Sequence, residues 1–196
     1  MNQDILLAVL LGFVGGSIPF GLLLTRAAGL GDIRDIGSGS IGATNVLRTG
    51  NKGLAAATVL LDAAKGAVPV LLAAYLWPGT EGWAAVAAVA GHCFTPWLRF
   101  RGGKGFATAA GVLLALAWPV MLVCAAIWAV TLAVSRISSV SSMTTVVLAP
   151  VATWALGYPQ IIVPLVAIAA IVLVQHRANI GRLMRGEEPK VGSAKK

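Results

Sequence analysis

The stretch GLAAATVLLDAAKGAVPVLLAAYLW, residues 53–77, decides the fold class of this chain. Only Asp62 and Lys65 are charged within it. About 20 apolar residues in a helix are enough to cross the hydrocarbon core of a bilayer, which is about 30 Å thick. The stretch therefore predicts a membrane-spanning helix. Because Asp62 and Lys65 are three residues apart, they share one face of it, where they can neutralise each other and fix helix packing or serve a function inside the membrane.

The composition of the whole chain points the same way. Of its 196 residues, 58% are hydrophobic and only 11% are charged. An ordinary soluble domain is about 25% charged, so this chain lacks the polar surface that a soluble enzyme or a disordered protein needs. The formal net charge of +8 comes from basic residues at the ends of apolar runs. That position favours membrane orientation and anionic ligands over nucleic acid.

Seven apolar runs can be distinguished along the chain, and we predict an all-α integral membrane protein with seven transmembrane helices. The runs cover residues 5–25, 53–77, 83–98, 106–117, 118–134, 143–156 and 161–175. The uncertain part is residues 106–134, which is too long for one span and short for two. We favour two helices that meet at Trp118-Pro119, because Arg136 and the basic tail then fall on the same side as the other basic connections.

That distribution of charge also predicts the orientation. Basic connections tend to remain in the cytoplasm, which places the N-terminus outside and the C-terminus inside. We expect a single membrane domain, residues 1–196. The polar segments on the basic side are 34–52, 91–105, 136–142 and 176–190.

The first polar segment has the features of an anion site. It contains the run Gly-Ser-Gly-Ser-Ile-Gly-Ala-Thr-Asn, residues 37–45, followed by Arg48. Glycines let a backbone approach a ligand closely, and hydroxyl, amide and guanidinium groups bind phosphate. The candidate ligand-binding residues are Ser38, Ser40, Thr44, Asn45 and Arg48. Taken alone, such a run is equally compatible with a flexible loop.

The second segment places Gly102-Gly103-Lys104-Gly105 directly before an apolar helix. The positive end of that helix and the charge of Lys104 would favour an anion. This is not an ATP-binding Walker sequence, because Gly105 stands where a Ser or Thr would hold magnesium. The alternative is a basic anchor with a glycine turn.

Two further segments lie on the basic side. A serine cluster that includes Ser141 and Ser142 follows Arg136, and His176-Arg177-Ala178-Asn179 follows the last apolar run. His176 and Asn179 are three residues apart and share a face if the segment is helical. A lone histidine there can also do no more than end a helix.

Together these segments resemble the bacterial acyl-phosphate:glycerol-3-phosphate acyltransferase family (PlsY) over nearly the whole chain. The first segment is similar to the family's G-S-G-N-x-G-A-T-N motif, with Ser40 at the usual Asn. The second resembles G-H-x-F-P followed by F-K-G-G-K-G, with Thr95 at the Pro and Arg101 at the first Lys. The third resembles H-R-x-N-I-x-R-L followed by G-x-E, which ends here at Glu188.

The resemblance implies a reaction in which a fatty acyl group moves from acyl phosphate to the 1-hydroxyl of glycerol 3-phosphate, giving lysophosphatidic acid and phosphate. It implies an enzyme of the bacterial inner (plasma) membrane whose active site, built from the four polar segments, faces the cytoplasm. It implies that Gly102–Gly105 cradles the acyl phosphate and that the acyl chain lies between helices. Catalytic roles are expected for His176, Lys104 and Asn179. Substrate contacts are expected for Ser38, Ser40, Thr44, Asn45, Arg48, Gly102, Gly103, Gly105, Ser141, Ser142, Arg177 and Glu188.

No strong general base is evident, because the H-x-x-x-x-D motif of other glycerolipid acyltransferases is absent. We expect direct attack by the hydroxyl, with the protein positioning the substrates and stabilising charge. The proton would pass to a substrate phosphate oxygen or to His176. We expect no cofactor and no metal. The expected partners are glycerol 3-phosphate, acyl phosphate and membrane lipid, with an acyl-phosphate-producing enzyme as a candidate protein partner.

The alternative function is transport of a phosphorylated metabolite across the membrane. Transporters often show internal repeats and polar groups at mid-depth. Here no repeat is visible, and only Asp62 and Lys65 favour transport. The remaining polar residues gather on one side of the membrane, which favours an enzyme.

Overall fold

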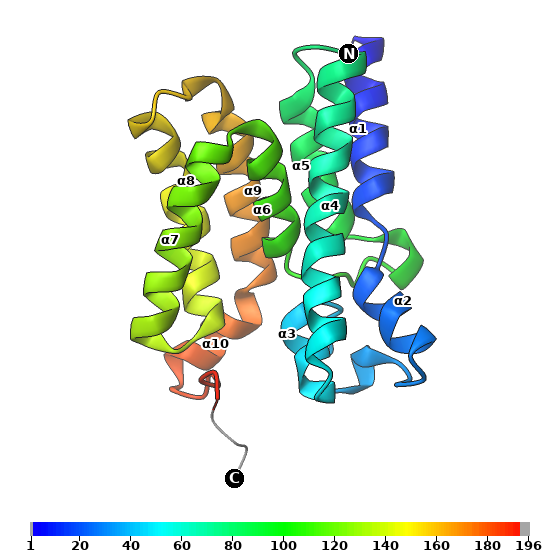
Figure 1. Cartoon of the computed structure of the whole chain (residues 1–196), viewed down its shortest axis with the longest axis vertical. Helices are drawn as coiled ribbons and strands as arrows, with labels where there is room; N and C mark the ends of the chain where they lie inside the picture. The colour runs from blue at the N-terminus through cyan, green and yellow to red at the C-terminus, as the bar shows by residue number, and fades with distance from the viewer. Residues whose placement is uncertain (1, 193–196) are drawn as a thin grey trace. The chain divides into compact units, whose positions relative to one another are not determined.

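The computed structural model describes residues 2–192, and every regular element among them is a helix. This confirms the all-α prediction. The α-helices are α1 Gln3–Gly16, α2 Phe20–Ala27, α3 Ala43–Val46, α4 Lys52–Leu76, α5 Glu81–Cys93, α6 Phe106–Leu116, α7 Trp118–Ser135, α8 Ser138–Ala155, α9 Ile162–Gln175 and α10 Arg177–Met184 (Figure 1). Short 3-10 turns cover Ile33–Asp35, Leu47–Thr49, Pro96–Leu98 and Pro159–Ile161. The chain divides into two compact units, one ending at Leu116 and the other beginning at Ala117.

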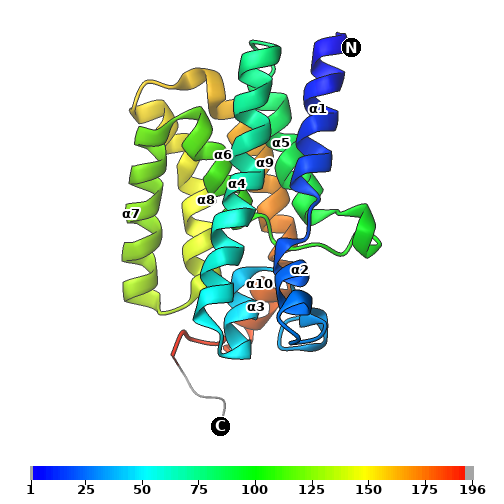
Figure 2. The ribbon, with the colours of Figure 1, turned by 45° about the vertical axis from the view of Figure 1, so that its right-hand side comes forward.

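The N-terminal unit is built around α4, which packs against α1, α5 and α6. Small residues allow these helices to approach closely. A Cβ on Gly16 would lie 2.0 Å from the carbonyl oxygen of Ala88 on α5, and one on Gly111 would lie 1.9 Å from that of Ala63 on α4. Close packing of this kind stabilises helix pairs in membranes, where no hydrophobic driving force holds helices together. Figures 1 and 2 both show α1, α4 and α5 running side by side.

A break at residues 17–19 separates α1 from α2. Pro19 cannot donate a backbone hydrogen bond, so the helical ladder is interrupted there. The chain beyond α5 braces this break. The Thr95 hydroxyl donates to the carbonyl oxygen of Ser17 at 2.8 Å, and the Trp97 indole N–H donates to the Ser17 hydroxyl at 2.8 Å. The break is therefore a fixed bend in the structure.

The C-terminal unit consists of the α7–α8 hairpin and α9, which packs against α8. Arg136 ends α7 in a left-handed conformation with φ of 59°. Of the polar segment 136–142, only Arg136 and Ile137 lie outside a helix, because α8 begins at Ser138 and takes in the whole serine cluster. Ser141 shows why the helix tolerates these residues. Its hydroxyl donates to the carbonyl oxygen of Ile137 at 3.1 Å.

Residues 106–134 form two helices, as predicted. The first ends at Leu116 and the second begins at Trp118, with Pro119 in its first turn. Proline fits there because the first N–H groups of a helix have no partner within it. The structure thus favours the interpretation that separates the fourth and fifth apolar runs.

The predicted number of spans is a separate question from the number of helices. Among the described residues, three helical stretches are long and apolar enough to cross a bilayer: Gln3–Ala27, Lys52–Leu76 and Trp118–Ser135. A fourth arises if Pro159–Gln175 and Arg177–Met184, which meet at a 58° bend, count as one. Helices α5 and α6 are shorter than an ordinary span. Seven spans therefore stays a prediction.

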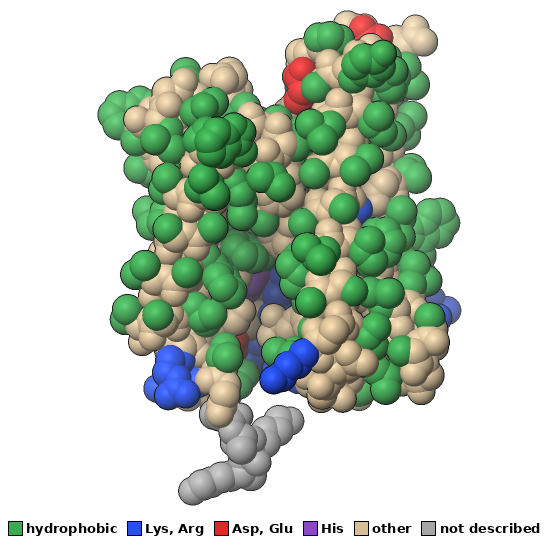
Figure 3. Space-filling view, viewed as in Figure 1, with side chains coloured by type: hydrophobic (Ala, Val, Ile, Leu, Met, Phe, Trp, Pro, Cys, Tyr) green, Lys and Arg blue, Asp and Glu red, His purple; other side chains and the backbone are tan. Residues whose placement is uncertain are grey.

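Charge is unevenly distributed over the N-terminal unit. Figure 3 shows acidic side chains at the end where the chain begins, and basic side chains mostly toward the opposite end, where α2 and α3 lie. This separation within one unit is the kind of asymmetry on which the positive-inside rule depends.

Candidate functional site

Asn45 is the centre of the glycine-rich segment in the N-terminal unit. Its side chain is 2% exposed. The Nδ2 group donates to the carbonyl oxygens of Ile33 (2.8 Å), Ile36 (2.9 Å) and Ser40 (2.9 Å). The Oδ1 atom accepts from the backbone N–H of Ser38 at 3.1 Å. These contacts give Asn45 a positioning role, and a direct contact with substrate stays a prediction.

The side chains that can reach a ligand lie around this centre. Ser38, Thr44 and Arg48 are exposed, and Ser40 is half-buried with its hydroxyl accepting from the N–H of Gly42. Gly37 has φ of +58°, and a Cβ there would lie 2.3 Å from Nη1 of Arg48. Glycine at this position thus allows the turn and leaves room for the guanidinium.

The surface beside this segment carries an ion cluster. Asp32 pairs with Arg34 at 2.6 Å and with Arg26 at 2.7 Å. The hydrogen bonds from the Arg34 guanidinium hold the pKa of the Asp32 carboxyl well below its usual range. The same pairing raises the pKa of Arg34. Asp32 is therefore ionised at neutral pH and leaves Arg26 and Arg34 partly neutralised.

The Gly-Gly-Lys-Gly segment is closed against the end of α5. The N–H of Gly102 donates to the carbonyl oxygen of Cys93, and the N–H of Gly103 donates to that of His92, both at 3.1 Å. These N–H groups satisfy carbonyl groups that the last turn of α5 leaves without helical partners. An anion-binding role for Gly102 and Gly103 stays a prediction.

Lys104 and Gly105 complete the segment. Lys104 is half-buried and lies two residues before α6. Gly105 has φ of +83°, and its carbonyl oxygen accepts the N–H of Ala109 at 2.8 Å as α6 begins. The lysine is thus held close to the positive end of a helix, a place that favours bound anions.

In the C-terminal unit, His176 lies at the junction of α9 and α10 and is buried. Its Nδ1 atom is 2.7 Å from the carbonyl oxygen of Val172. A carbonyl oxygen only accepts hydrogen bonds, so Nδ1 must carry the hydrogen. In the neutral ring the lone pair then belongs to Nε2, which is the nitrogen able to take up a proton.

Glu188 is the centre of the third polar segment. Its carboxylate accepts from the Ser139 hydroxyl at 2.7 Å, from Nε of Arg182 at 2.7 Å and from Nδ2 of Asn179. Burial opposes the charge of this carboxyl, but the three donors outweigh that effect and lower its pKa. Glu188 therefore joins the start of α8 to α10 and stays ionised at neutral pH.

Asn179 depends on Glu188 for its orientation. It is 3% exposed, and its Nδ2 group faces the carboxylate. Its Oδ1 atom is buried and has no hydrogen-bond partner within residues 2–192. An unpaired buried acceptor is uncommon, and a hydroxyl group of a ligand would satisfy it.

The positions of the other predicted site residues of this unit say less about a role in binding or catalysis. Ser141 and Ser142 are buried in the first turns of α8. Arg177 is exposed and donates to the backbone and side chain at the end of α9. Neither Ser139 nor Arg182 is among the site residues predicted from the sequence, although Arg182 is the second Arg of the H-R-x-N-I-x-R-L motif. Their shared contact with Glu188 places both in this segment.

Residues 2–192 contain no group of three or more His, Cys, Asp or Glu side chains able to hold a metal ion. That the reaction needs no metal stays a prediction.

The comparisons with known proteins agree with one another. The family described as Glycerol-3-phosphate acyltransferase matches residues 6–186. A glycerol-3-phosphate acyltransferase of Erythrobacter litoralis is 59% identical over 192 residues, which cover 98% of each chain. One from Mesorhizobium japonicum is 55% identical over 193 residues, covering 98% of this chain and 99% of the relative.

Solved structures are similar as well. The crystal structure of the integral membrane acyltransferase PlsY in its glycerol 3-phosphate form has a TM-score of 0.91 and 33% identity, covering 97% of this chain and 96% of the other. The lysophosphatidic acid form of PlsY has a TM-score of 0.90 and 32% identity over the same shares.

Proposed function

The chain belongs to the glycerol-3-phosphate acyltransferase family, and we propose that it transfers a fatty acyl group from acyl phosphate to the 1-hydroxyl of glycerol 3-phosphate. The products are lysophosphatidic acid and inorganic phosphate. The observation that carries the proposal is the likeness to PlsY in forms named for glycerol 3-phosphate and for lysophosphatidic acid. These are the acceptor and the product of such a transfer.

Acyl phosphate is proposed as the donor because the predicted site residues include cations and hydrogen-bonding groups but no evident strong general base. A donor that reacts with little acid–base help suits such a site. An acyl phosphate is a mixed anhydride with a good leaving group, so its acyl carbon needs little activation. Arg48 and Lys104 supply positive charge for phosphate groups, and the exposed hydroxyls of Ser38 and Thr44 can donate hydrogen bonds to them.

In the proposed step, the 1-hydroxyl oxygen attacks the acyl carbon. A carbon–oxygen bond to glycerol forms, the bond from the acyl carbon to the bridging oxygen breaks, and phosphate leaves with that oxygen. The hydroxyl proton passes to a phosphate oxygen or to Nε2 of His176. The buried Oδ1 of Asn179 is suited to accept a hydrogen bond from the attacking hydroxyl and so to orient it.

We further propose seven spans, with the N-terminus outside and all four polar segments facing the cytoplasm of a bacterial inner membrane. The support is that helices make up most of each predicted apolar run, the first of which is divided between α1 and α2. An enzyme that produces acyl phosphate remains a candidate partner.

Single cysteines at Asp4, Tyr158 and Arg185 in a variant lacking the native cysteines would test the orientation. Labelling of intact cells by an impermeant reagent should reach positions 4 and 158 and not position 185.

The choice of donor tests the function itself. Purified protein would receive glycerol 3-phosphate with palmitoyl phosphate in one assay and palmitoyl-CoA in another, and lysophosphatidic acid would be quantified. We expect product only from palmitoyl phosphate, and its loss in Lys104→Ala. Lys52→Ala is the matched control, because Lys52 is an exposed lysine at the start of α4.

Product from neither donor with folded protein would contradict the proposal. Uptake of a phosphorylated metabolite into vesicles would then become the function to test.

A separate kinetic measurement tests the role of His176. If His176→Gln lowers kcat, a role in proton transfer is supported, and if it raises KM alone, a binding role is indicated.

A further inference from the structure

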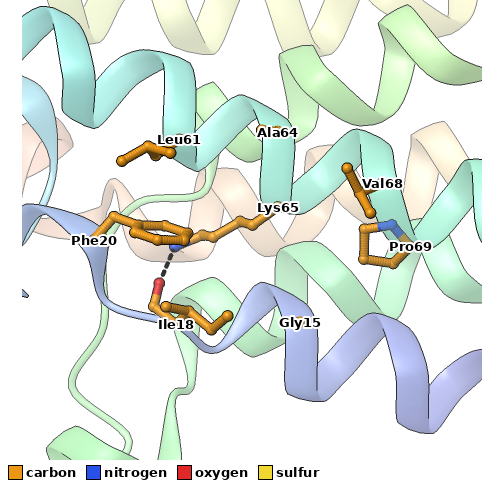
Figure 4. A pocket seen from close by; sticks show the side chains of 8 residues that line it. All are labelled: Gly15, Ile18, Phe20, Leu61, Ala64, Lys65, Val68 and Pro69. Atoms are coloured by element: carbon orange, nitrogen blue, oxygen red, sulfur yellow. Dashed lines mark hydrogen bonds between the residues drawn. The ribbon is translucent and has the colours of Figure 1, made fainter.

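Helix α4 carries a buried ion pair that the proposed reaction does not use. Asp62 is 2% exposed and Lys65 is 5% exposed, and Nζ of Lys65 lies 2.7 Å from Oδ1 of Asp62. The same Nζ donates to the carbonyl oxygen of Ile18 at 2.7 Å, past the ring of Phe20 (Figure 4). Charged groups at membrane depth cost free energy, so their presence there indicates a function or a structural requirement.

His92 connects this ion pair to the Gly-Gly-Lys segment. It lies on α5, is 3% exposed, and its Nδ1 atom faces Oδ1 of Asp62 at 3.8 Å. The other ring nitrogen faces Gly103, since a Cβ on Gly103 would lie 2.1 Å from Nε2 of His92. The imidazole therefore fills the space between α4 and the segment that carries Lys104.

This geometry explains why residue 103 is a glycine. The φ of Gly103 is not positive, so its backbone does not lie in the left-handed region that favours glycine. What excludes a side chain is the imidazole of His92. Gly102 differs, because a Cβ there would lie 2.0 Å from the backbone oxygen of His92, which no change of side chain removes.

We propose that His92 is a positioning residue for the acyl transfer. Its ring lies beside Asp62 of α4 and fills the space next to Gly103, and so fixes Gly103 and through it the place of Lys104. The inference rests on the proposed function, because it concerns where Lys104 meets a phosphate group. None of Asp62, Lys65 and His92 needs to touch the substrate in order to act in this way.

A double-mutant cycle tests the contact between the ring and Gly103. Gly103→Ala and His92→Ala are each expected to lower kcat/KM about tenfold, within the range of coupled neighbouring residues. Combined, they are expected to recover several-fold over Gly103→Ala, because the new methyl group occupies space that the ring has left. Gly102→Ala is the matched control, and adding His92→Ala to it should recover nothing.

A second pair of variants tests the link to α4. Asp62→Asn/Lys65→Met removes both charges together, so no single buried charge is left to unfold the protein. We expect the melting temperature to fall little, while KM and kcat change in the same proportion as in His92→Ala. A purely structural role for the pair would change the melting temperature and leave the kinetic constants of the folded fraction as in the wild type.

The outcomes separate this inference from the function on which it rests. A wild-type protein without acyltransferase activity contradicts the proposed function, and the melting temperatures of the same cycle then decide whether the ring and Gly103 are coupled. An active wild type with additive effects of His92→Ala and Gly103→Ala overturns the inference. So does equal recovery in the Gly102→Ala background.

Discussion

The polar segments of the two units are held together by different kinds of centre. In the N-terminal unit, the neutral amide of Asn45 binds three carbonyl oxygens and one N–H group of its own loop. In the C-terminal unit, the charged carboxylate of Glu188 binds the side chains of Ser139, Asn179 and Arg182. The first centre organises backbone and cannot titrate. The second organises side chains and depends on its charge, so acid and substitution should affect the two units differently.

The largest effect is expected from Asn45→Asp. The aspartate can still accept from the N–H of Ser38, but it cannot donate to the three carbonyl oxygens. Each buried polar group left unpaired costs about 1–3 kcal/mol. We therefore expect a fall in melting temperature and loss of lysophosphatidic acid formation. Asn51→Asp is the control, because Asn51 caps α4 through Oδ1 and aspartate caps equally well.

Glu188→Gln should have a smaller effect. Glutamine keeps the shape of the side chain but weakens hydrogen bonds to a charged group, which contribute about 1.5–3 kcal/mol. Turnover should fall because the amide of Asn179 loses its fixed orientation. The control is Glu187→Gln, whose exposed pair with Arg185 contributes less than about 1 kcal/mol. Equal losses of turnover in both variants would show that Glu188 does not organise this unit more than Glu187 does.

Acid should distinguish the two centres further. The pKa of Glu188 is lowered from its ordinary value of 4.5, so the stability it contributes is fully present above that value. It is lost as the pH falls through the lowered pKa of the folded protein. Unfolding curves from pH 6 downward should show this loss in the wild type, and a shallower dependence in Glu188→Gln. Identical pH profiles would exclude Glu188 as the titrating group.

The smallest effect is expected at the surface ion cluster. Asp32→Asn keeps the side-chain oxygen that accepts the N–H of Arg34 but removes the charge that Arg26 and Arg34 share. Exposed ion pairs contribute about 0–1 kcal/mol and are screened by salt. The difference in melting temperature from the wild type should be small and should shrink further at high salt. A large, salt-independent difference would mean that this cluster also organises its unit.

Much of the fold was predictable because apolar runs and glycine-proline breaks are local signals. The division at Trp118-Pro119 is an example, since Pro119 fits the first turn of a new helix. The start of α8 was missed because a serine cluster is typical of connections. Here Ser141 satisfies its hydroxyl within the helix itself.

The site was predictable as a set of segments but not as a set of contacts. The roles of Asn45 and Glu188 depend on partners that no periodicity links to them, such as Ile33 and Ser139. The N–H groups of Gly102 and Gly103 complete the end of α5, a contact that the sequence does not indicate. These contacts are set by tertiary packing between residues that are distant in the sequence.

Attack on the acyl carbon, with cleavage of its bond to the bridging oxygen, can be tested by isotope transfer. Palmitoyl phosphate labelled with oxygen-18 at the bridging oxygen would be incubated with glycerol 3-phosphate and the purified protein, and both products would be analysed by mass spectrometry. The account predicts that all of the label is found in inorganic phosphate and none in lysophosphatidic acid. Label in lysophosphatidic acid, or no lysophosphatidic acid from folded protein, would contradict it.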